Sequence, residues 1–219
     1  MQYGDPLLGS EMYLTQILQL LNRMGVKHLE DLVRKAIKLV NEKGIPINHI
    51  LAELLIYYYL SNCGYSYISI EESVGIAKCD VYAQKGDFNI CIEVDFYTVP
   101  SNFILNRTKY ILARHIRKVI QIVKSGIKAA VFAYPYGSVP LIPIELVKPV
   151  EGRSRRKLLD LISSVREISP LDNGDIDYLM KAHIHSVLIF DIDRGKIYEL
   201  FPQDVEKLME LYDSYVRKY

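Results

Sequence analysis

Four carboxylates stand in sequence surroundings that are unusual for surface acids. Glu53 is the only charged residue in the stretch 50–63, which is apolar on nearly every side. Asp80 lies within the alternating run KCDVYA, and Glu93 and Asp95 lie two residues apart within ICIEVDF. Residues two apart on a strand share one face, where like charges repel each other. Because an unpaired buried carboxylate is strongly unfavourable, we expect a cation to compensate these acids.

A divalent cation would satisfy all four acids at once, since Mg²⁺ binds carboxylate oxygens and retains several waters. The turn signal KGD joins two of the expected strands into a hairpin. In this hairpin, residues whose numbers add to about 172 or 173 face each other, so Asp80 lies opposite Ile92 or Glu93. The alternative is that Asp80 and Glu93 form ion pairs with basic residues: Lys78, Arg114 or Lys118. For the four acids together we favour the metal site.

Helical spacing of apolar residues predicts two helices near the N-terminus and a third that begins just after Pro46. We expect them over 10–24, 28–43 and 48–61, with Ser10 as an N-cap and Gly25 and Gly44 as the ends of the first two. The mixed charge of the second helix is not typical of a DNA-recognition helix. We therefore interpret residues 1–45 as a helical cap that packs on the rest of the chain.

Alternation of apolar and polar residues replaces the helical period after the third helix. Three strands are expected in YSYISIEES, KCDVYAQ and FNICIEVDFY, followed by a basic helix over 100–125 and a buried strand over 128–136. The region 136–150 is predicted as loop or edge strand and 170–177 as turns, with a helix over 154–168, a hairpin around 193–195 and a closing helix over 203–217. The chain is thus predicted to be an α/β protein, with residues 46–219 as one domain.

The order of these elements and the spacing D-x12-E-V-D of Asp80, Glu93 and Asp95 resemble the PD-(D/E)XK, restriction-endonuclease-like nucleases. The resemblance covers about 46–135 and implies an αβββαβ core with a mixed sheet, extended by residues 136–219 with a hairpin and a helix. It implies that Asp80 and Glu93 are the metal-binding acids of the second and third strands. It also implies that Glu53 is the acid that the helix of this family often carries.

The sequence departs from the family at one position, because Asp95 stands where a lysine is usual. In the family, that lysine helps to activate the attacking water or stabilises the developing charge, and some members recruit it from the following helix. Candidates on this helix are Lys109, Arg114 and Lys118. The resemblance thus implies Mg²⁺ or Mn²⁺ as cofactor and two sets of residues: Glu53, Asp80, Glu93 and Asp95 as metal ligands, and Asp80, Glu93, Asp95, Lys118 and Arg114 as catalytic residues.

The net charge of +1 conceals a strong asymmetry along the chain. The segment 101–166 carries thirteen Lys and Arg and three acids, so its charge is +10 and that of the remainder is −9. Clustered cations bind phosphate backbones, although basic helices can also be solvated faces balanced by acidic neighbours. The nucleic-acid-binding candidates are Lys78, Arg107, Lys109, Arg114, Arg117, Lys118, Arg153, Arg155 and Arg156.

The function expected from these observations is Mg²⁺-dependent hydrolysis of phosphodiester bonds in DNA. The alternative is a nuclease-like module that binds nucleic acid or protein without catalysis, which Asp95 in place of lysine favours. The sequence contains no glycine-rich phosphate-binding loop, so we expect no nucleotide cofactor. An edge strand and an amphipathic C-terminal helix make a homodimer plausible.

Composition also bears on the cellular setting. The three cysteines have no CxxC spacing and are interpreted as buried packing residues in a reducing interior. No secretory leader and no apolar stretch long enough to span a bilayer are recognised, so we expect a cytoplasmic protein without a membrane partner. The seventeen tyrosines fit a thermophile-like bias toward Ile, Lys and Tyr.

Overall fold

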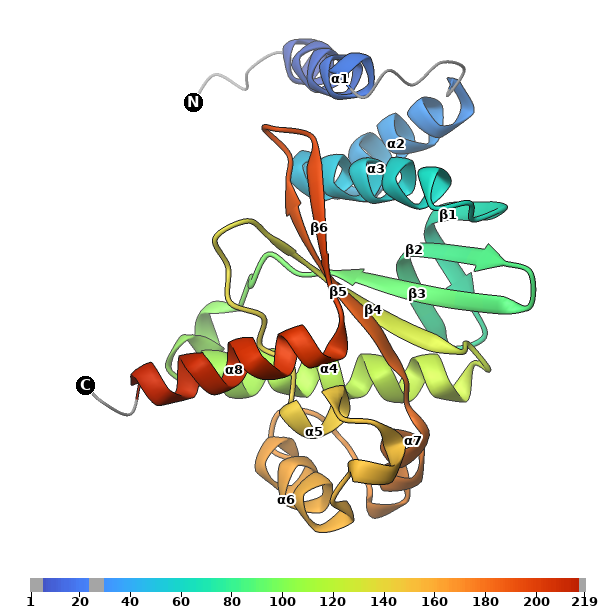
Figure 1. The fold of residues 1–219 in the computed structure, drawn as a ribbon. Helices are drawn as coiled ribbons and strands as arrows, with labels where there is room; N and C mark the ends of the chain where they lie inside the picture. The colour runs from blue at the N-terminus through green and yellow to red at the C-terminus, as the bar shows by residue number, and fades with distance from the viewer. Residues whose placement is uncertain (1–5, 24–29, 217–219) are drawn as a thin grey trace.

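A computed structural model describes residues 6–23 and 30–216 as a six-stranded sheet with helices on both faces (Figure 1). Three helices cover one face, at the top of the view: α1 (Pro6–Arg23), α2 (Glu30–Lys43) and α3 (Ile47–Asn62). The other face is covered by α4 (Arg107–Lys124), α5 (Ile144–Val147), α6 (Arg155–Val165), α7 (Ile176–Lys181) and α8 (Pro202–Val216). Short 3-10 turns lie at Ser101–Asn106, Val150–Gly152 and Asn173–Asp175.

The sheet is mixed, with strands in the order β1-β2-β3-β4-β5-β6. The first three strands form an antiparallel meander: β1 (Tyr67–Val74), β2 (Ala77–Lys85) and β3 (Phe88–Val94). Strands β4 (Ala129–Pro135) and β5 (Ile184–Asp191) continue it in parallel, and β6 (Lys196–Leu200) pairs antiparallel with β5. Parallel neighbours need a crossover, which α4 supplies between β3 and β4 and which α5 to α7 supply between β4 and β5. The predicted α/β class and the order helix, three strands, helix, strand over 47–135 are confirmed.

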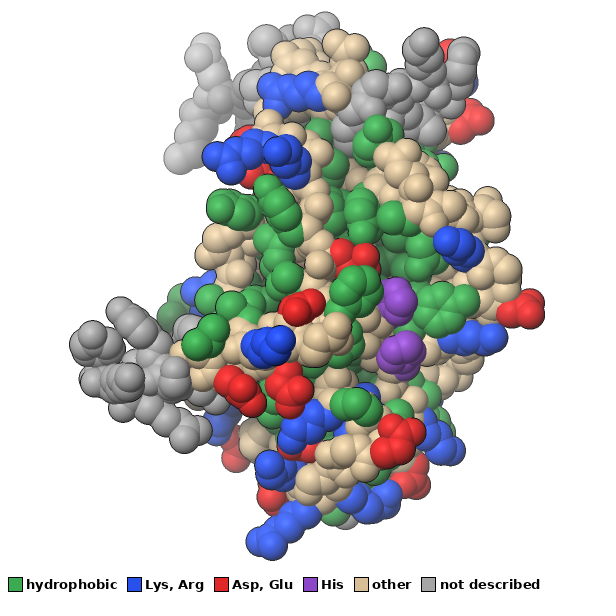
Figure 2. Space-filling model, viewed as in Figure 1, with side chains coloured by type: hydrophobic (Ala, Val, Ile, Leu, Met, Phe, Trp, Pro, Cys, Tyr) green, Lys and Arg blue, Asp and Glu red, His purple; other side chains and the backbone are tan. Residues whose placement is uncertain are grey.

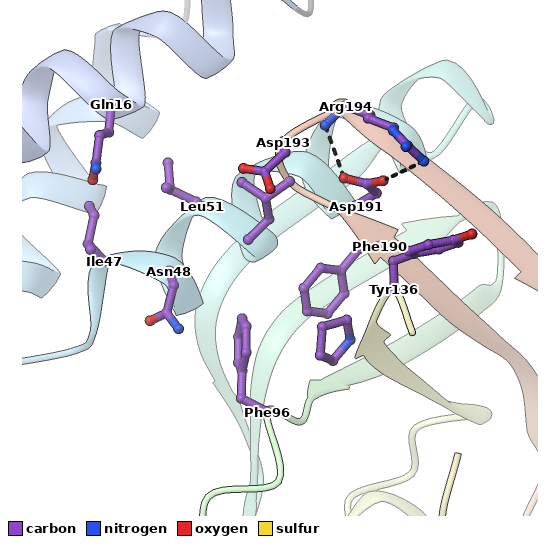
Figure 3. Close-up of a pocket in the computed structure, with 12 residues that line it drawn as sticks. Gln16, Ile47, Asn48, Leu51, Phe96, Tyr136, Phe190, Asp191, Asp193 and Arg194 are labelled. Atoms are coloured by element: carbon purple, nitrogen blue, oxygen red, sulfur yellow. Dashed lines mark hydrogen bonds and ion pairs between the residues drawn. The ribbon is translucent and has the colours of Figure 1, made fainter. Parts of the chain in front are cut away.

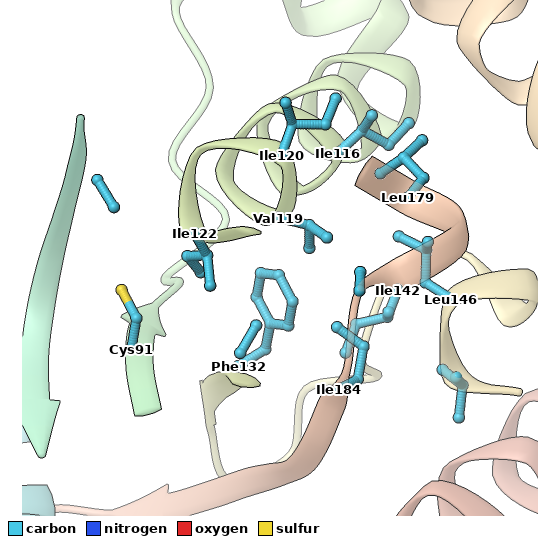
Figure 4. Close-up of a cluster of buried hydrophobic side chains, with 14 of the residues drawn as sticks. Cys91, Ile116, Val119, Ile120, Ile122, Phe132, Ile142, Leu146, Leu179 and Ile184 are labelled. Atoms are coloured by element: carbon cyan, nitrogen blue, oxygen red, sulfur yellow. The ribbon is translucent and has the colours of Figure 1, made fainter. Parts of the chain in front are cut away.

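Two hydrophobic cores lie on the two faces of the sheet, because successive strand residues point to opposite sides. In β4, Phe132 packs with Val119 of α4 and Ile184 of β5 (Figure 4), whereas Val131 belongs to the core under α3. Helix α3 is apolar all round since it lies between the sheet and the first two helices. Residues Leu20 of α1 and Leu39 of α2 share its core. The division of the chain at residue 45 stays a prediction.

Several predicted boundaries were wrong. Helix α1 begins at Pro6, so Ser10 lies inside the helix and is not its cap; proline is well suited to a first helical turn. Gly25 lies outside the described residues. The region 136–150 is mostly loop, as one of the two alternatives predicted, but it contains the short helix α5. The turns expected over 170–177 include the 3-10 turn Asn173–Asp175, which Asp172 caps, and they lead into α7. Short helices such as these carry too little periodicity to be recognised.

The cysteines differ from the prediction that all three are buried packing residues. Cys79 of β2 and Cys91 of β3 are buried but are joined by a disulfide, with Cα atoms 5.3 Å apart. Cys63, which follows α3, is exposed. None of the described helices is both long enough and apolar enough to cross a membrane.

Candidate metal centre

Helix α3 carries two polar groups on the side that it turns toward the sheet. His49 and Glu53 are four residues apart and therefore lie one above the other on the helix surface. His49 Nε2 is 3.2 Å from Glu53 Oε1 and 3.6 Å from Asp80 Oδ2. The Glu53 side chain is fully buried. The helix thus brings an imidazole and a carboxylate onto β2.

Asp80 lies in β2 where the ladder with β3 ends. The register pairs Val81 with Ile92, as the predicted count requires, but Asp80 itself has no ladder partner, so the expected pairing of Asp80 with Ile92 or Glu93 is not formed. Asp80 does not extend the ladder, because its Oδ2 accepts a hydrogen bond from the Val94 backbone N–H at 2.7 Å. Its carboxylate therefore holds the end of β3 in place while facing α3.

Glu71 reaches the same place from β1 through an unusual backbone conformation. Its φ of 48° lies in the left-handed region, which is uncommon for a residue other than glycine. In the register between β1 and β2, Ile70 pairs with Val81 and Glu72 pairs with Cys79, and Glu71 between them has no ladder partner. The Glu71 side chain is 4% exposed and lies 2.7 Å from Lys78 Nζ. Strained positions of this kind concentrate at functional sites.

His49, Glu53, Glu71 and Asp80 form what we call the α3 acidic group, in which one ligand atom from each residue lies within 4.8 Å of the others. Burial raises the pKa of Glu53 to about 7, and repulsion from Asp80 adds to this while His49 opposes it. Burial also disfavours the charged imidazole of His49, but hydrogen bonding and attraction to Asp80 and Glu53 outweigh it and raise its pKa to about 10. Three carboxylates thus meet one imidazolium and, at the edge of the group, the Lys78 ammonium that pairs with Glu71.

A metal ion fits this donor set. Both carboxylate oxygens of Glu53 are buried and accept no hydrogen bond of regular geometry, and His49 Nε2, 3.2 Å from Oε1, is the donor group near them. Buried charges are normally hydrogen-bonded, paired or bound to a metal. Carboxylates are ligands for hard ions such as Mg²⁺ and Mn²⁺, and an imidazole among them favours a transition metal such as Mn²⁺. The α3 acidic group could therefore hold a divalent cation through four side chains.

The other two predicted acids lie on the opposite face of the sheet, against α4. Glu93 Oε1 is 3.3 Å from Arg114 Nη2, and Glu93 Oε2 contacts Lys118 Nζ. Asp95 Oδ2 is 2.8 Å from His115 Nε2, and Asp95 Oδ1 is 3.8 Å from Arg114 Nη1. We call these five residues the α4 ion-pair group.

The charges of the α4 ion-pair group largely compensate each other. Burial raises the pKa of Glu93 and repulsion from Asp80 adds to this, while the cations of α4 act in the opposite direction. Burial also works against ionised Asp95, but its hydrogen bond with His115 and the nearby guanidinium outweigh this and lower its pKa. Both acids thus have cationic partners within the protein.

The structure therefore separates the four predicted metal ligands into two pairs. Glu53 and Asp80 meet in the α3 acidic group, whereas Glu93 and Asp95 contact α4. Sequence reasoning missed His49 and Glu71. The i, i+4 spacing of His49 and Glu53 could have indicated the former. The turn at 75–76 could have indicated the latter, because it sets Glu71 against Asp80 by the same counting used for the second hairpin.

The basic residues of α4 and its surroundings have different roles. Lys118 bridges Glu93 and the β2 backbone, since its Nζ contacts Glu93 and donates to the Lys78 carbonyl. Lys78 itself pairs with Glu71. Three further candidates are exposed along the start and outer side of α4: Arg107, Lys109 and Arg117.

Arg153 is a correction to the predicted nucleic-acid contacts. It is 9% exposed, and its guanidinium donates to the backbone carbonyls of Leu146, Lys148 and Leu179. It therefore joins α5, α6 and α7 rather than facing a ligand. Arg155 pairs with Asp177 at 2.7 Å, and Arg156 is exposed.

The +10 segment does not form a continuous basic surface on the face shown in Figure 2. On the face shown in Figure 2, Lys and Arg side chains are scattered and alternate with Asp and Glu. A band of hydrophobic side chains runs through the middle of this face. This face therefore shows the charge balance expected of solvated helices.

Comparison with known proteins finds little similarity. No family model matches the chain, and no curated protein sequence matches it. One solved structure that is similar is described as Pyrococcus furiosus SfsA in complex with Ca²⁺, with 18% sequence identity and a TM-score of 0.30. The match covers 70% of this chain and 62% of that chain, which is less than two thirds of its length. A TM-score this low carries no argument about function.

Proposed function

We propose that this protein is a divalent-metal-dependent nuclease that hydrolyses phosphodiester bonds in DNA and that it is a divergent relative of the PD-(D/E)XK nucleases. The observation that carries the proposal is the convergence of His49, Glu53, Glu71 and Asp80, with the Glu53 oxygens buried and without a hydrogen bond of regular geometry. The element order around this group supports the family relationship. The bridging position of Lys118 supports it too, because a lysine from the following helix then takes the place that Asp95 leaves vacant.

The acidic side chains would bind the ion, and the basic side chains of α4 would act on the phosphate. In this proposal the α3 acidic group holds Mn²⁺ or Mg²⁺, which supplies Lewis acidity and lowers the pKa of a bound water. Lys118 and Arg114 balance the negative charge that develops on the phosphate. Glu93 would act as a further ligand by exchanging its contacts with these cations for the ion. Asp95 acts as a positioning residue through His115.

DNA would approach along α4 in this proposal. Exposed Arg107, Lys109 and Arg117 would contact flanking phosphates, and such contacts weaken as salt concentration rises. Arg156 is a further exposed candidate on α6. A homodimer and a cytoplasmic location stay predictions.

One observation favours the alternative of a non-catalytic binding module. Glu93, the first acid of the family's third strand, is fully engaged with Arg114 and Lys118. If that pairing persists when metal is added, the chain would bind a phosphate backbone without cutting it. The two functions share the basic surface and differ in the need for metal.

A cleavage assay separates them. Supercoiled plasmid, linear duplex, single strands and a four-way junction are incubated with Mn²⁺, Mg²⁺ or EDTA, using the wild type and Asp80→Asn. The exposed Asp177→Asn serves as a matched control, since Asp177 lies in α7, on the other side of the sheet from α3, and pairs with Arg155. We expect metal-dependent cutting by the wild type and the control and none by Asp80→Asn, with DNA binding retained. Salt-sensitive binding without cutting by any of the three would support the binding module instead.

A further inference from the structure

An open cleft lies beside the α3 acidic group. Its volume is about 700 Å³, within the range of roughly 300–1,000 Å³ that small-molecule sites occupy. Figure 3 shows it between the first turns of α3 and the β5–β6 hairpin. Its floor and walls are mostly apolar or aromatic: Ile47, Leu51, Phe96, Pro135, Tyr136 and Phe190.

The cleft adjoins the candidate metal centre through Phe96, which lines the cleft and contacts the ring of His49. Asn48 lines the cleft, and the next residue, His49, belongs to the α3 acidic group. The ring of Phe96 lies 5.9 Å from the ring of His49 and 5.3 Å from that of Phe190, centroid to centroid. A substrate whose phosphate lies at the metal centre can therefore place its adjoining group in the cleft.

The charged residues at the cleft favour an uncharged group over a second phosphate. Arg194 is the only Lys or Arg among the described lining residues, and it pairs with Asp191 at 3.5 Å. Arg23, which lines the adjoining hollow, donates to the Asp193 backbone carbonyl at 2.9 Å. The Asp193 side chain is exposed, and its carboxylate has no hydrogen-bond or ion-pair partner among the described residues. The nearby cations thus already have partners, and the unpaired carboxylate suits an uncharged group that donates hydrogen bonds.

The rings and amides of the cleft suit a nucleobase. Aromatic side chains stack on bases regardless of their identity, and Tyr136 is 61% exposed at the rim. Asn and Gln amides donate to and accept from base edges, and both Gln16 and Asn48 line the cleft. The Asp193 carboxylate can only accept, so it suits a base with an amino group.

We propose that the cleft binds one unpaired nucleobase next to the phosphodiester at the α3 acidic group, so that the substrate is a single strand or a duplex with a displaced base. This inference rests on the proposed function, because the nuclease site explains why a nucleotide would lie here. A base still paired and stacked in a duplex cannot enter the cleft. Bases with amino groups bind better than thymine.

The experiment measures binding of oligonucleotides in Ca²⁺. The probes are a single strand with one 2-aminopurine, the same strand with an abasic site at that position, and the matching duplex. The proteins are the wild type, Tyr136→Leu, Tyr136→Phe and the control Tyr67→Leu, whose ring is similarly exposed but lies on β1. Thermal unfolding of each variant checks that its fold is intact.

We expect the wild type to quench 2-aminopurine fluorescence and to bind the single strand more tightly than the duplex or the abasic strand. Tyr136→Leu should weaken single-strand binding by roughly 5- to 100-fold and remove most of the quenching, because a stacking platform is lost. Tyr136→Phe and Tyr67→Leu should behave like the wild type. Asp193→Asn should abolish the preference for adenine or cytosine over thymine at the probe position.

Equal binding of the intact and abasic strands, or no effect of Tyr136→Leu, would overturn the inference. Its failure can be distinguished from failure of the proposed function. Metal-dependent cutting that proceeds equally well on duplex and abasic strands would leave the nuclease standing and remove the base-binding cleft. Quenching that depends on Tyr136 in a protein that never cuts would leave the cleft and remove the nuclease.

Discussion

The two groups of carboxylates on the sheet differ in how their charge is balanced. The α3 acidic group has three acids and one imidazole, with Lys78 at its edge, and it leaves the Glu53 oxygens without a hydrogen bond of regular geometry. The α4 ion-pair group has two acids in contact with Arg114, His115 and Lys118. In the first group, His49 is the basic side chain in contact with Glu53, whereas in the second group each acid contacts a Lys or Arg side chain. Acids in core strands are thus candidates for ligand binding when the fold places few cationic side chains in contact with them.

The largest expected effect is on metal binding and cleavage. Asp80→Asn and Glu53→Gln should each weaken Mn²⁺ binding by more than the ~10–100-fold that loss of an outer partner costs, and cleavage should fall to background. Asp95→Asn should leave Mn²⁺ affinity almost unchanged because Asp95 is held by α4. Calorimetric titration of the three variants checks this. Loss of Mn²⁺ affinity in Asp95→Asn alone would reverse the assignment of the two groups.

The bridging lysine tests whether the two groups cooperate. Lys118→Met should reduce the rate of cleavage by about 10²- to 10³-fold, because a positive charge near the phosphate is lost. Mn²⁺ affinity should not fall, since Lys118 is not a ligand. Single-turnover cleavage with saturating Mn²⁺ gives the rate, and Lys124→Met on the same helix is the matched control. An unchanged rate would mean that Lys118 only neutralises Glu93.

In metal-free protein, replacing one acid by its neutral amide should change the free energy of unfolding in opposite directions in the two groups. Asp95→Asn should lower the free energy of unfolding by about 2–3 kcal/mol, because it breaks a buried pair and leaves its cationic partners behind. Glu53→Gln should keep or raise the free energy of unfolding by up to ~1 kcal/mol, since a buried charge among acids is removed. Urea unfolding at pH 7 with EDTA measures both. A loss of similar size in the two variants would contradict the comparison.

The smallest expected effect is the pH dependence of the two changes in the free energy of unfolding, one caused by Asp95→Asn and the other by Glu53→Gln. The pKa of Asp95 is below its usual 3.8, so its stabilisation is present above that pH and is lost as pH falls through the lowered pKa. The pKa of Glu53 rises from 4.5 to about 7, so the folded state binds its proton more tightly and the wild type loses stability as pH rises across this window.

The gap between wild type and Asp95→Asn should therefore close below pH 3.8, and the advantage of Glu53→Gln should grow between pH 4.5 and 7. Urea unfolding in EDTA at several pH values follows both gaps. Gaps that stay constant with pH would show that neither acid titrates as its surroundings require.

Local pattern in the sequence determined most of the secondary structure and one long-range relationship. The hairpin turn at 85–87 is short, and strand residues alternate strictly, so counting from the turn gives the register of β2 and β3, in which Val81 faces Ile92. The apolar surroundings of Glu53 likewise indicated a buried charge in need of a partner. These inferences succeed because a strand period and a tight turn leave few alternatives.

The tertiary structure alone decided which partner each acid received. Counting from the turn at 75–76 brings Glu71 near Asp80, but the left-handed backbone position through which Glu71 joins the α3 acidic group has no signal in the alternating pattern. Asp95 finds His115 because α4 crosses under β3, twenty residues later in the chain. Arg153 is buried among carbonyls although its sequence context is basic. Charge and periodicity can be read from each segment of the sequence. Which charged residues pair with each other depends on which faces of the sheet the crossover helices cover.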